Sequence, residues 1–438
     1  MRQGRAVLLA ALVVTGLLVG LGAVTAAEGD PTISLSSGST AAGAGAVVVD
    51  DGLTVSGSGA IAGATVSFAS GFDADVDRLA VDTSAGGSLT DSYDTSSGVL
   101  TLSGSASPEE MQSVLRTVTY TYSGSADASA REVDVRFALG TDGSPLYLPA
   151  TGHYYEYVST AETFDDARTA AAGETYLGQE GYLATITSQV EDTTVTGLSD
   201  AAWIGASDRD EEANWTWIAG PEKGIQFWQG VGDTGSVKNG LYAGWDTGQP
   251  QANKGPEDGV VINEYATQWH DEFIDQDTSY GYVVEYGGLS GDPAVVADRT
   301  IVVDQSAPVV SAVQITADST PLTTNDTVTV TATVTDPDGV ASVTADAAAF
   351  GAGQIDLDAA DGDSYSASFT VGSGAVDGPQ AVIISATDDA GNTAVGAGEV
   401  VTGSITVNPD GSTDFRTVTL PRSFTDPVVI AKPLETTS

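Results

Sequence analysis

The stretch Gly181-Tyr182-Leu183-Ala184-Thr185-Ile186 lies near the middle of the chain, and the run Trp203-Ile204-Gly205-Ala206 follows it. Both are short and mostly apolar, as strands buried in a sheet are. Between them, Ser188 and Glu191 form the pattern of a capping box, which begins a helix. This part of the chain therefore predicts a strand, a helix and a second strand in close succession.

The flanking residues, 150–288 in all, continue this mixture of strands and helices. A strand pattern spans residues 154–158, and Thr163 caps a helical pattern with Ala167 and Ala171 on one side. We expect most of the chain's tryptophans, which all lie here, to pack in a core: Trp203, Trp215, Trp217, Trp228, Trp245 and Trp269.

The order of these residues resembles the C-type lectin-like domain across residues 150–288. No single match is specific to this family, but the whole set of matches in this order is. The matches are Phe164, Ala167-Arg168, residues 181–186, Trp203-Ile204-Gly205, Trp215-Thr216-Trp217, Trp245, Glu257-Asp258, Trp269-His270-Asp271 and residues 282–286. The resemblance implies an α+β domain with calcium as its cofactor and, in the sugar-binding members of the family, a glycan as its partner.

The two disulfides that are usual in this family are missing, because the chain has no cysteine. The resemblance places small or apolar residues at the corresponding positions: Ala171, Gly259, Ile274 and Val284. Packing must then replace the roughly 2–4 kcal/mol that a disulfide contributes. The absence of cysteine also excludes thiol catalysis and thiolate metal sites.

The resemblance also implies an auxiliary calcium site, with the ligands Asp208, Glu212, Glu257 and Asp258. A further acid of the family pattern is missing because Ala252 stands there, and Asn253 could substitute. Calcium takes about six to eight oxygen ligands, and clustered carboxylates without a cation repel one another. The alternative is that these acids belong to a generally acidic surface.

A primary calcium and sugar site is implied at Gln249, Gln251, Glu257 and Asp271. In sugar-binding members, a tripeptide with a central proline provides two side-chain oxygens, and here it is Gln249-Pro250-Gln251. A later Glu and a Trp-Asn-Asp motif complete the site, and vicinal sugar hydroxyls fill the open positions. His270 replaces the Asn, and imidazole is a poor ligand for a hard cation. Two carboxylates and two amides therefore remain for this site.

Residues 28–142 consist of short alternating strand patterns, such as residues 65–68 and 133–137. One helix is predicted, because Ser107 is an N-cap and Pro108 stands at the first helical position. The motifs between residues 63 and 120 resemble the cadherin-like repeats of the chondroitin sulfate proteoglycan type found in surface adhesins. That resemblance implies a β sandwich with a structural role.

Residues 300–400 predict a second β sandwich, which resembles the immunoglobulin-like domains of prokaryotic surface proteins. Residues 402–438 either complete this sandwich or begin a further β domain. The whole chain is thus predicted to be a mostly β multidomain protein. Acids in the turns of the second sandwich could hold a calcium ion, although turn acids are more often simply solvated: Asp336, Asp338, Asp388 and Asp389.

The chain carries 60 acidic and 15 basic residues, a net charge of −45. Binding to nucleic acid requires clustered Lys and Arg, so we expect no such partner. A dispersed acidic surface that is poor in lysine is typical of a protein from a high-salt cell, most often an archaeal one, where salt screens the self-repulsion. An ordinary acidic secreted protein is the alternative.

Residues 1–27 have the pattern of an export signal, in which Arg2 and Arg5 precede an apolar run with a small-residue cleavage site. The run is also just long enough to form an uncleaved membrane anchor. Either way, the protein is expected to be secreted or on the cell surface. Sequons occur at Asn214 and Asn325, and Asn325 is the better placed for a glycan, at a loop-to-strand edge.

The chain is predicted to bind rather than to catalyse. It has two histidines, His153 and His270, and no phosphate-binding loop or zinc-ligand spacing. Three interpretations remain: a surface adhesin that binds a glycan with calcium, a structural envelope protein that keeps only the fold, or a virus-associated protein that binds a protein partner. The expected partner is therefore a glycan or a surface protein.

Overall fold

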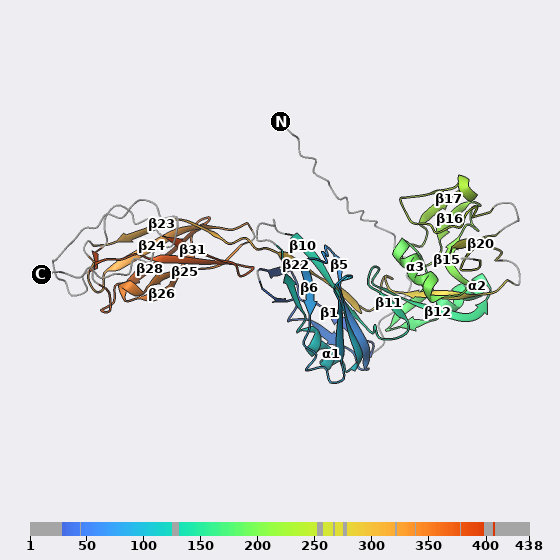
Figure 1. Cartoon of the computed structure of the whole chain (residues 1–438), viewed down its shortest axis with the longest axis horizontal. Helices are drawn as coiled ribbons and strands as arrows, with labels where there is room; N and C mark the ends of the chain where they lie inside the picture. The colour runs from blue at the N-terminus through green and yellow to red at the C-terminus, as the bar shows by residue number, and fades with distance from the viewer. Residues whose placement is uncertain are drawn as a thin grey trace, which may run out of the picture.

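The chain folds into three β-rich lobes that lie in a row in the computed structural model (Figure 1). The structure describes residues 29–43, 45–124, 131–251, 257–265, 268–274, 278–319, 322–337, 339–376, 378–397 and 406–407. The predicted export signal, residues 1–27, and most of residues 402–438 lie outside these ranges. No helix within them is long and apolar enough to cross a bilayer.

The first lobe, called here the first sandwich, packs its sheets around one hydrophobic core. Its large sheet has the strand order β2-β22-β10-β5-β8-β7, a smaller sheet has the order β3-β9-β6, and β1 pairs with β4. The strands are β1 (Thr32–Ser34), β2 (Thr40–Ala42), β3 (Val47–Val48), β4 (Thr54–Ser56), β5 (Ile61–Ser70), β6 (Asp77–Ala80), β7 (Thr90–Asp94), β8 (Val99–Ala106), β9 (Thr119–Tyr122), β10 (Arg131–Leu139) and β22 (Val296–Val303).

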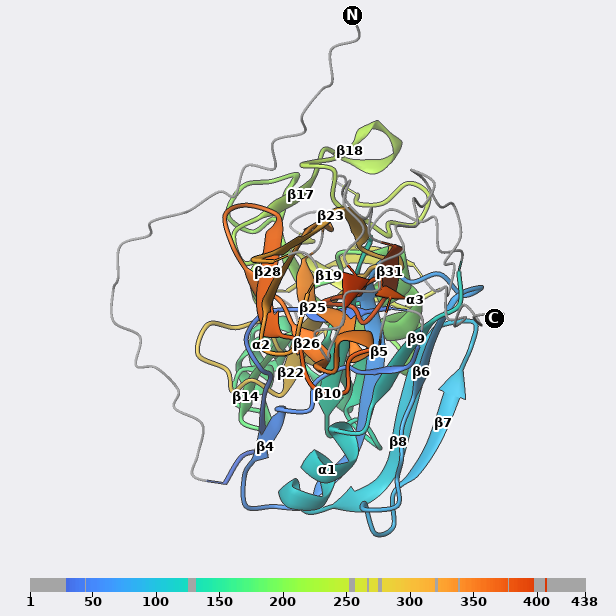
Figure 2. The same ribbon diagram turned by 90° about the vertical axis from the view of Figure 1, so that its left-hand side faces the viewer.

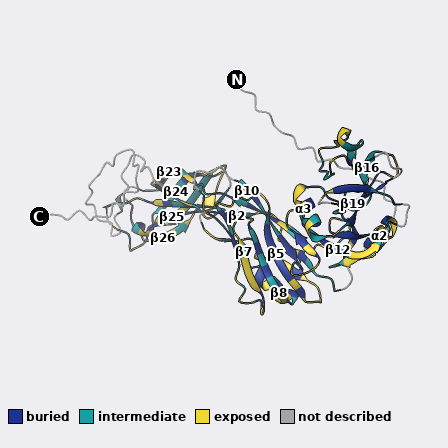
Figure 3. Cartoon of the chain, turned by 45° about the vertical axis from the view of Figure 1, so that its right-hand side comes forward, coloured by how far each residue is buried: buried dark blue, intermediate teal, exposed yellow. Residues whose placement is uncertain are grey.

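Local sequence signals explain the elements of this sandwich. In β10, Val133, Val135 and Phe137 are fully buried, as the alternating pattern predicts. Helix α1 (Pro108–Leu115) begins at the predicted cap, because the Ser107 side chain accepts from the Glu110 backbone and the Glu110 side chain accepts in return. Strand β7 lies at the edge of the large sheet and is mostly exposed (Figure 3).

One strand of the first sandwich comes from far along the chain. Strand β22 pairs antiparallel with β10, from Arg131↔Val303 to Ala138↔Val296, and parallel with β2. The residues between β10 and β22 are therefore inserted between two adjacent strands of one sheet. The structure differs here from the predicted boundary at residue 300, because residues 300–303 belong to the first sandwich. The alternation within a strand does not reveal which sheet the strand joins.

The inserted residues form a mixed sheet with two helices, called here the middle lobe because it comes second along the chain; in Figure 1 it lies at one end of the row, beside the first sandwich. Its strand order is β11-β12-β21-β15-β16-β17-β18, with β14 also on β21 and with β19 and β20 extending from β15. The elements are β11 (Leu146–Leu148), β12 (His153–Glu162), α2 (Phe164–Ala171), β13 (Thr175–Tyr176), β14 (Gln179–Leu183), α3 (Gln189–Leu198), β15 (Ala202–Ser207), β16 (Asn214–Trp217), β17 (Gln226–Gln229), the short 3-10 turn η1 (Gly232–Thr234), β18 (Ser236–Val237), β19 (Gly259–Ile262), β20 (Trp269–Glu272) and β21 (Tyr280–Tyr286).

The middle lobe follows the sequence pattern closely. Thr163 and Ser188 cap α2 and α3 through their side chains, as predicted. The prediction that most tryptophans pack in the core is confirmed, because four of the six are no more than 1% exposed: Trp203, Trp215, Trp217 and Trp269.

The third lobe, the last sandwich, has two four-stranded sheets of orders β23-β24-β28-β27 and β26-β25-β30-β31 around its own core. It faces the reader in Figure 2. The elements are β23 (Val309–Ala317), β24 (Thr327–Thr335), β25 (Val340–Ala347), η2 (Ala348–Phe350), β26 (Gly353–Asp356), β27 (Asp358–Ala359), β28 (Ser364–Thr370), β29 (Gly378–Pro379), β30 (Ile383–Asp388), β31 (Thr393–Ala397) and β32 (Thr406–Val407). The whole protein is thus mostly β.

We expect Ile301→Ala to destabilise the first sandwich by about 2–5 kcal/mol, because it removes a fully buried side chain from that core. Hydrogen exchange should quicken in β5 and β10 and stay unchanged in the last sandwich. Val302→Ala is the matched control, since Val302 is its half-exposed neighbour and should cost much less. Faster exchange confined to the last sandwich would contradict the observed strand order.

Candidate calcium and glycan site

Three strands of the middle lobe bring the predicted site together. Strand β15 ends at Ser207, which pairs with Gly259 at the start of β19, and β19 pairs in turn with β20, which carries Asp271. Asp208 follows β15 directly, and Glu257-Asp258 directly precede β19. The antiparallel register therefore places these carboxylates at the same end of the sheet.

Asp208 is a buried acid, only 5% exposed. Its Oδ2 accepts a hydrogen bond from the Ala213 backbone N–H at 2.9 Å, while its Oδ1 is buried without a hydrogen-bond partner. Burial, together with the negative charges of Glu212 and Asp258, raises the pKa of Asp208 to about 7. Among the described residues, no Lys or Arg forms an ion pair with this carboxylate.

Asp271 is in a similar position on β20 and is 3% exposed. Its Oδ2 accepts from the Gln251 backbone N–H at 2.6 Å, and its Oδ1 is buried without a hydrogen-bond partner. Burial raises the pKa of Asp271 to about 7, and the charges of Glu257 and Asp208 act in the same direction. Because the charge of Asp208 acts on Asp271, the auxiliary and primary sites share one electrostatic neighbourhood.

Gln249 and His270 form a pair beside Asp271. The Gln249 Nε2 lies 2.9 Å from the His270 Nδ1, and an amide nitrogen can only donate, so Nδ1 accepts and the ring proton is on Nε2. That nitrogen lies 3.5 Å from an Asp246 carboxylate oxygen. The Gln249 Oε1 is left buried without a hydrogen-bond partner. This oxygen fits the predicted role of Gln249 as an amide ligand.

Among the described residues, three buried acceptor oxygens of the predicted ligands thus lack a hydrogen-bond donor: Asp208 Oδ1, Asp271 Oδ1 and Gln249 Oε1. Leaving such an acceptor unsatisfied costs about 1–3 kcal/mol, which a bound cation would offset. They are hard oxygen ligands of the kind that calcium takes.

Other predicted ligands are not assembled in the same way. Glu212 is exposed, and Gln251 contributes its backbone N–H to Asp271. Glu257 and Asp258 are buried at the same end of the sheet. Even so, in the described part of the chain these carboxylates do not meet as a group of three within 4.8 Å. Asn253 lies outside the described residues.

Two acids of α3, Glu191 and Asp192, are buried, and Asp192 supports the site; the sequence analysis identified only Glu191, as part of a capping box. Asp192 accepts from the Trp269 Nε1 at 2.7 Å and from the Tyr242 hydroxyl at 2.9 Å, so it holds the strand that carries Asp271. Burial and the neighbouring Glu285 raise the pKa of Glu191 to about 7. In the sequence, the signal that could have identified both acids was that Glu191 and Asp192 are adjacent and lie shortly before the apolar Val195 of the same helix.

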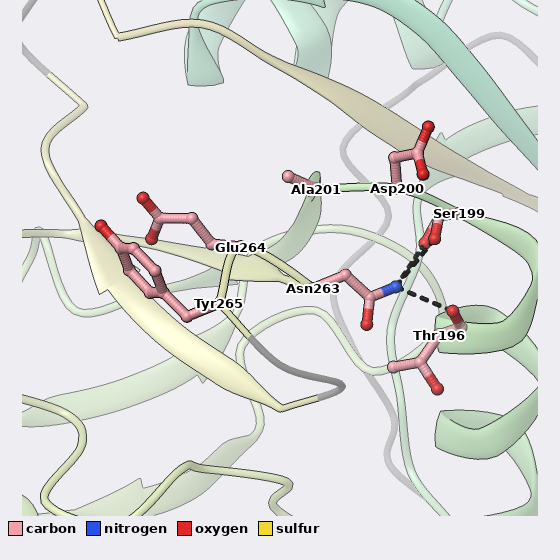
Figure 4. A pocket seen from close by; sticks show the side chains of 7 residues that line it. All are labelled: Thr196, Ser199, Asp200, Ala201, Asn263, Glu264 and Tyr265. Atoms are coloured by element: carbon pink, nitrogen blue, oxygen red, sulfur yellow. Dashed lines mark hydrogen bonds between the residues drawn. The ribbon is translucent and has the colours of Figure 1, made fainter.

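A separate depression lies at the end of α3 and contains none of the predicted ligands. It is lined by Thr196, Ser199, Asp200, Ala201, Asn263, Glu264 and Tyr265 (Figure 4). The Asn263 Nδ2 donates to the Thr196 and Ser199 carbonyls at 2.8 and 2.9 Å, which ties the helix to the loop after β19. Tyr265 is 75% exposed, and its ring lies 5.1 Å from that of His270.

The two sequons differ in their exposure. Asn325 is exposed in the loop before β24. Asn214 is half-buried at the start of β16, and its Nδ2 donates to Glu211 at 3.0 Å. Glycosylation stays a prediction at both positions, and Asn325 is the accessible one.

Two of the known proteins to which part of the chain is similar are lectins. A stretch of 112 residues is 30% identical to an alpha-N-acetylgalactosamine-specific lectin of Patiria pectinifera, over 23% of this chain and 64% of that lectin. The solved C-type lectin CEL-I from Cucumaria echinata is 19% identical and covers 31% of this chain and 90% of its own, with a TM-score of 0.24. The chain is therefore similar to a lectin over part of its length.

The chain as a whole is similar to part of one very large protein. It is 46% identical over 431 residues to halomucin of Haloquadratum walsbyi, which covers 93% of this chain and 5% of halomucin. A solved structure of a 1.5-MDa bacterial ice-binding adhesin is 15% identical and covers 86% of this chain and 97% of its own, with a TM-score of 0.18. No family model matches the chain.

After divalent cations are removed with a chelator, the middle lobe should lose stability as the pH rises from about 4 to about 7. The folded chain raises the pKa of Asp208 and Asp271 from 3.8 to about 7, so it holds protons that the unfolded chain has released in this window. Stability falls wherever the folded state binds more protons. Thermal unfolding followed by tryptophan fluorescence reports on this lobe, because every tryptophan lies in it.

In that experiment, Asp208→Asn should flatten part of the pH dependence. Asp210→Asn is the matched control, because Asp210 is an exposed aspartate two residues away and should leave the slope unchanged. Equal slopes in the wild type and both variants would show that Asp208 does not titrate in this window.

Proposed function

We propose that the protein is an exported surface adhesin of a high-salt archaeal cell, whose middle lobe binds calcium and, through calcium, a glycan. The observation that carries this proposal is the set of buried acceptor oxygens without donors on Asp208, Asp271 and Gln249. A hard cation takes such oxygens as ligands, and the surrounding negative charge favours its binding.

The cation near Asp208 would have a mainly structural role. Glu212 and Glu257-Asp258 would complete its ligand shell by turning their side chains toward Asp208, whose pKa already responds to Glu212 and Asp258. Binding would replace the proton on Asp208 and fix the loop between β15 and β16 against β19.

The sugar would bind at the other half, beside Gln249, Gln251 and Asp271. Vicinal hydroxyls of a pyranose are neutral oxygens that can fill open positions on a bound calcium ion. The similarity to a lectin named for alpha-N-acetylgalactosamine supports a terminal sugar of that kind as the first probe.

The flanking sandwiches would act as rigid spacers, and we propose no catalytic role for any lobe. Parallel pairing of β2 with β22 supports the cadherin-like class for the first sandwich, and two four-stranded sheets support the immunoglobulin-like class for the last. The similarity to halomucin supports a location at the cell surface. Residues 1–27 would direct export as a cleaved signal, with an uncleaved membrane anchor as the alternative.

A second candidate is a structural or virus-associated protein that uses the same fold to bind a protein. The observation that favours it is His270, which stands where a sugar-binding site has an amide and which contacts Gln249 instead. The exposed Tyr265 beside it offers an aromatic side chain of the type common in protein interfaces.

On a glycan array in concentrated potassium chloride with calcium, the full chain should bind glycans that end in alpha-N-acetylgalactosamine, and a chelator should abolish the binding. Asp271→Asn should weaken binding roughly 10–100-fold, because it removes a charged ligand. Asp210→Asn is the exposed control, and tryptophan fluorescence checks that each variant is folded.

Glycan binding that survives the chelator would rule out the calcium-mediated mechanism. A protein partner that binds equally with and without calcium, together with a silent array, would favour the second candidate. If the chelator changes neither the melting temperature of the middle lobe nor its binding, the middle lobe does not use calcium.

A further inference from the structure

The first and last sandwiches meet at three aspartates from three separate parts of the chain. Asp304 directly follows β22, Asp336 directly follows β24, and Asp388 ends β30. One carboxylate oxygen of each lies within 4.8 Å of those of the other two. The fold therefore brings the end of the first sandwich and two turns of the last to one point.

Hydrogen bonds and close packing build this junction. The Asp304 N–H donates to the Ala42 carbonyl at 3.0 Å, which holds Asp304 against the end of β2. The Asn392 Nδ2 donates to the Asp304 carbonyl at 3.0 Å and to Asp388 at 2.9 Å. Gly43 approaches the facing turn so closely that a Cβ there would lie 2.4 Å from a carbonyl oxygen. The two sandwiches are thus in direct contact around the aspartates.

Asp304 provides a second, independent observation. It is only 1% exposed, and its Oδ1 accepts from the Ser306 N–H at 2.8 Å, but its Oδ2 is buried without a hydrogen-bond partner. Asp388 is also buried, and neither it nor Asp304 forms an ion pair with Lys or Arg among the described residues. A buried carboxylate oxygen without a donor or a positive partner is costly and is what a cation would satisfy.

We propose that Asp304, Asp336 and Asp388 bind a divalent cation of the calcium class, which joins the first sandwich to the last. Three carboxylates this close repel one another, and a bound cation converts that repulsion into attraction. Carboxylate oxygens are the ligands that calcium prefers. Because its ligands come from both lobes, the ion fixes their relative orientation, and this site is independent of the one in the middle lobe.

Calorimetric titration of the chelator-stripped full chain with calcium chloride tests the number of sites. The Asp304→Asn/Asp388→Asn variant should bind one equivalent less than the wild type. Asp361→Asn, an exposed aspartate of the last sandwich, should bind as the wild type does. Asp208→Asn/Asp271→Asn should keep the junction equivalent, so that failure at one site is distinguished from failure at the other.

Hydrogen exchange locates the effect in the wild-type chain itself. At a calcium concentration about 100 times the dissociation constant, openings that release the ion should become roughly 100-fold rarer. Amides at Ser306 and Asn392, which donate to the ligand carboxylates, should exchange correspondingly more slowly. Unchanged exchange in the wild type, or an equal number of equivalents in the Asp304→Asn/Asp388→Asn variant, would overturn the proposal.

Discussion

The antiparallel pairing of β10 with β22 is the interaction on which the arrangement of the three lobes depends. It holds both ends of the middle lobe at one place, since the Leu139 N–H donates to the Val295 carbonyl at 3.0 Å. Arg136 and Asp298 add a two-point ion pair across the same strands, with both N–O distances at 2.8 Å. The Tyr154 hydroxyl, from the middle lobe, donates to the Leu139 carbonyl at 2.5 Å. The middle lobe is therefore attached by a sheet rather than by a single linker.

Dense packing replaces the missing disulfides in the middle lobe. A Cβ on Gly259 would lie 2.6 Å from the Ile274 side chain. These two positions, which correspond to cysteines in the family, are therefore in close contact without a covalent bond. Ala171 and Val284, the other two of the four positions, are both fully buried in one core. Aromatic contacts such as Trp217–Phe227, at 4.5 Å between ring centroids, strengthen the region beneath the site. The lobe thus gains from apolar contact the stability that a disulfide would otherwise contribute.

The features that could be predicted from the sequence are those set by local interactions or by residue identity. Ser107, Thr163 and Ser188 were identifiable as helix caps because a cap bonds to a backbone group only three residues away. Asp208 and Asp271 were identifiable from their motifs, and both are buried. The partner of β22 was not identifiable, because strand pairing is decided by long-range packing. Asp304 was missed for the same reason: Asp336 and Asp388 stand out as turn acids, but only the pairing of β22 brings Asp304 to them.

The large negative charge of the chain does not explain these buried acids. Concentrated salt screens exposed carboxylates from one another, but it acts much less on carboxylates from which water is excluded. Asp208, Asp271 and Asp304 are almost completely buried, so a high-salt medium does not relieve their cost. For Asp208 and Asp271, whose pKa is about 7, a proton can do so in acidic solution, but that proton is lost as the pH rises above neutral. The proposed cation would satisfy the same oxygens on the alkaline side of that value, where the exposed acids of the surface are ionised. With such an ion, both groups of acids would be charged at the same pH: the exposed acids would be stabilised by water and salt, and the buried acids by the bound ion.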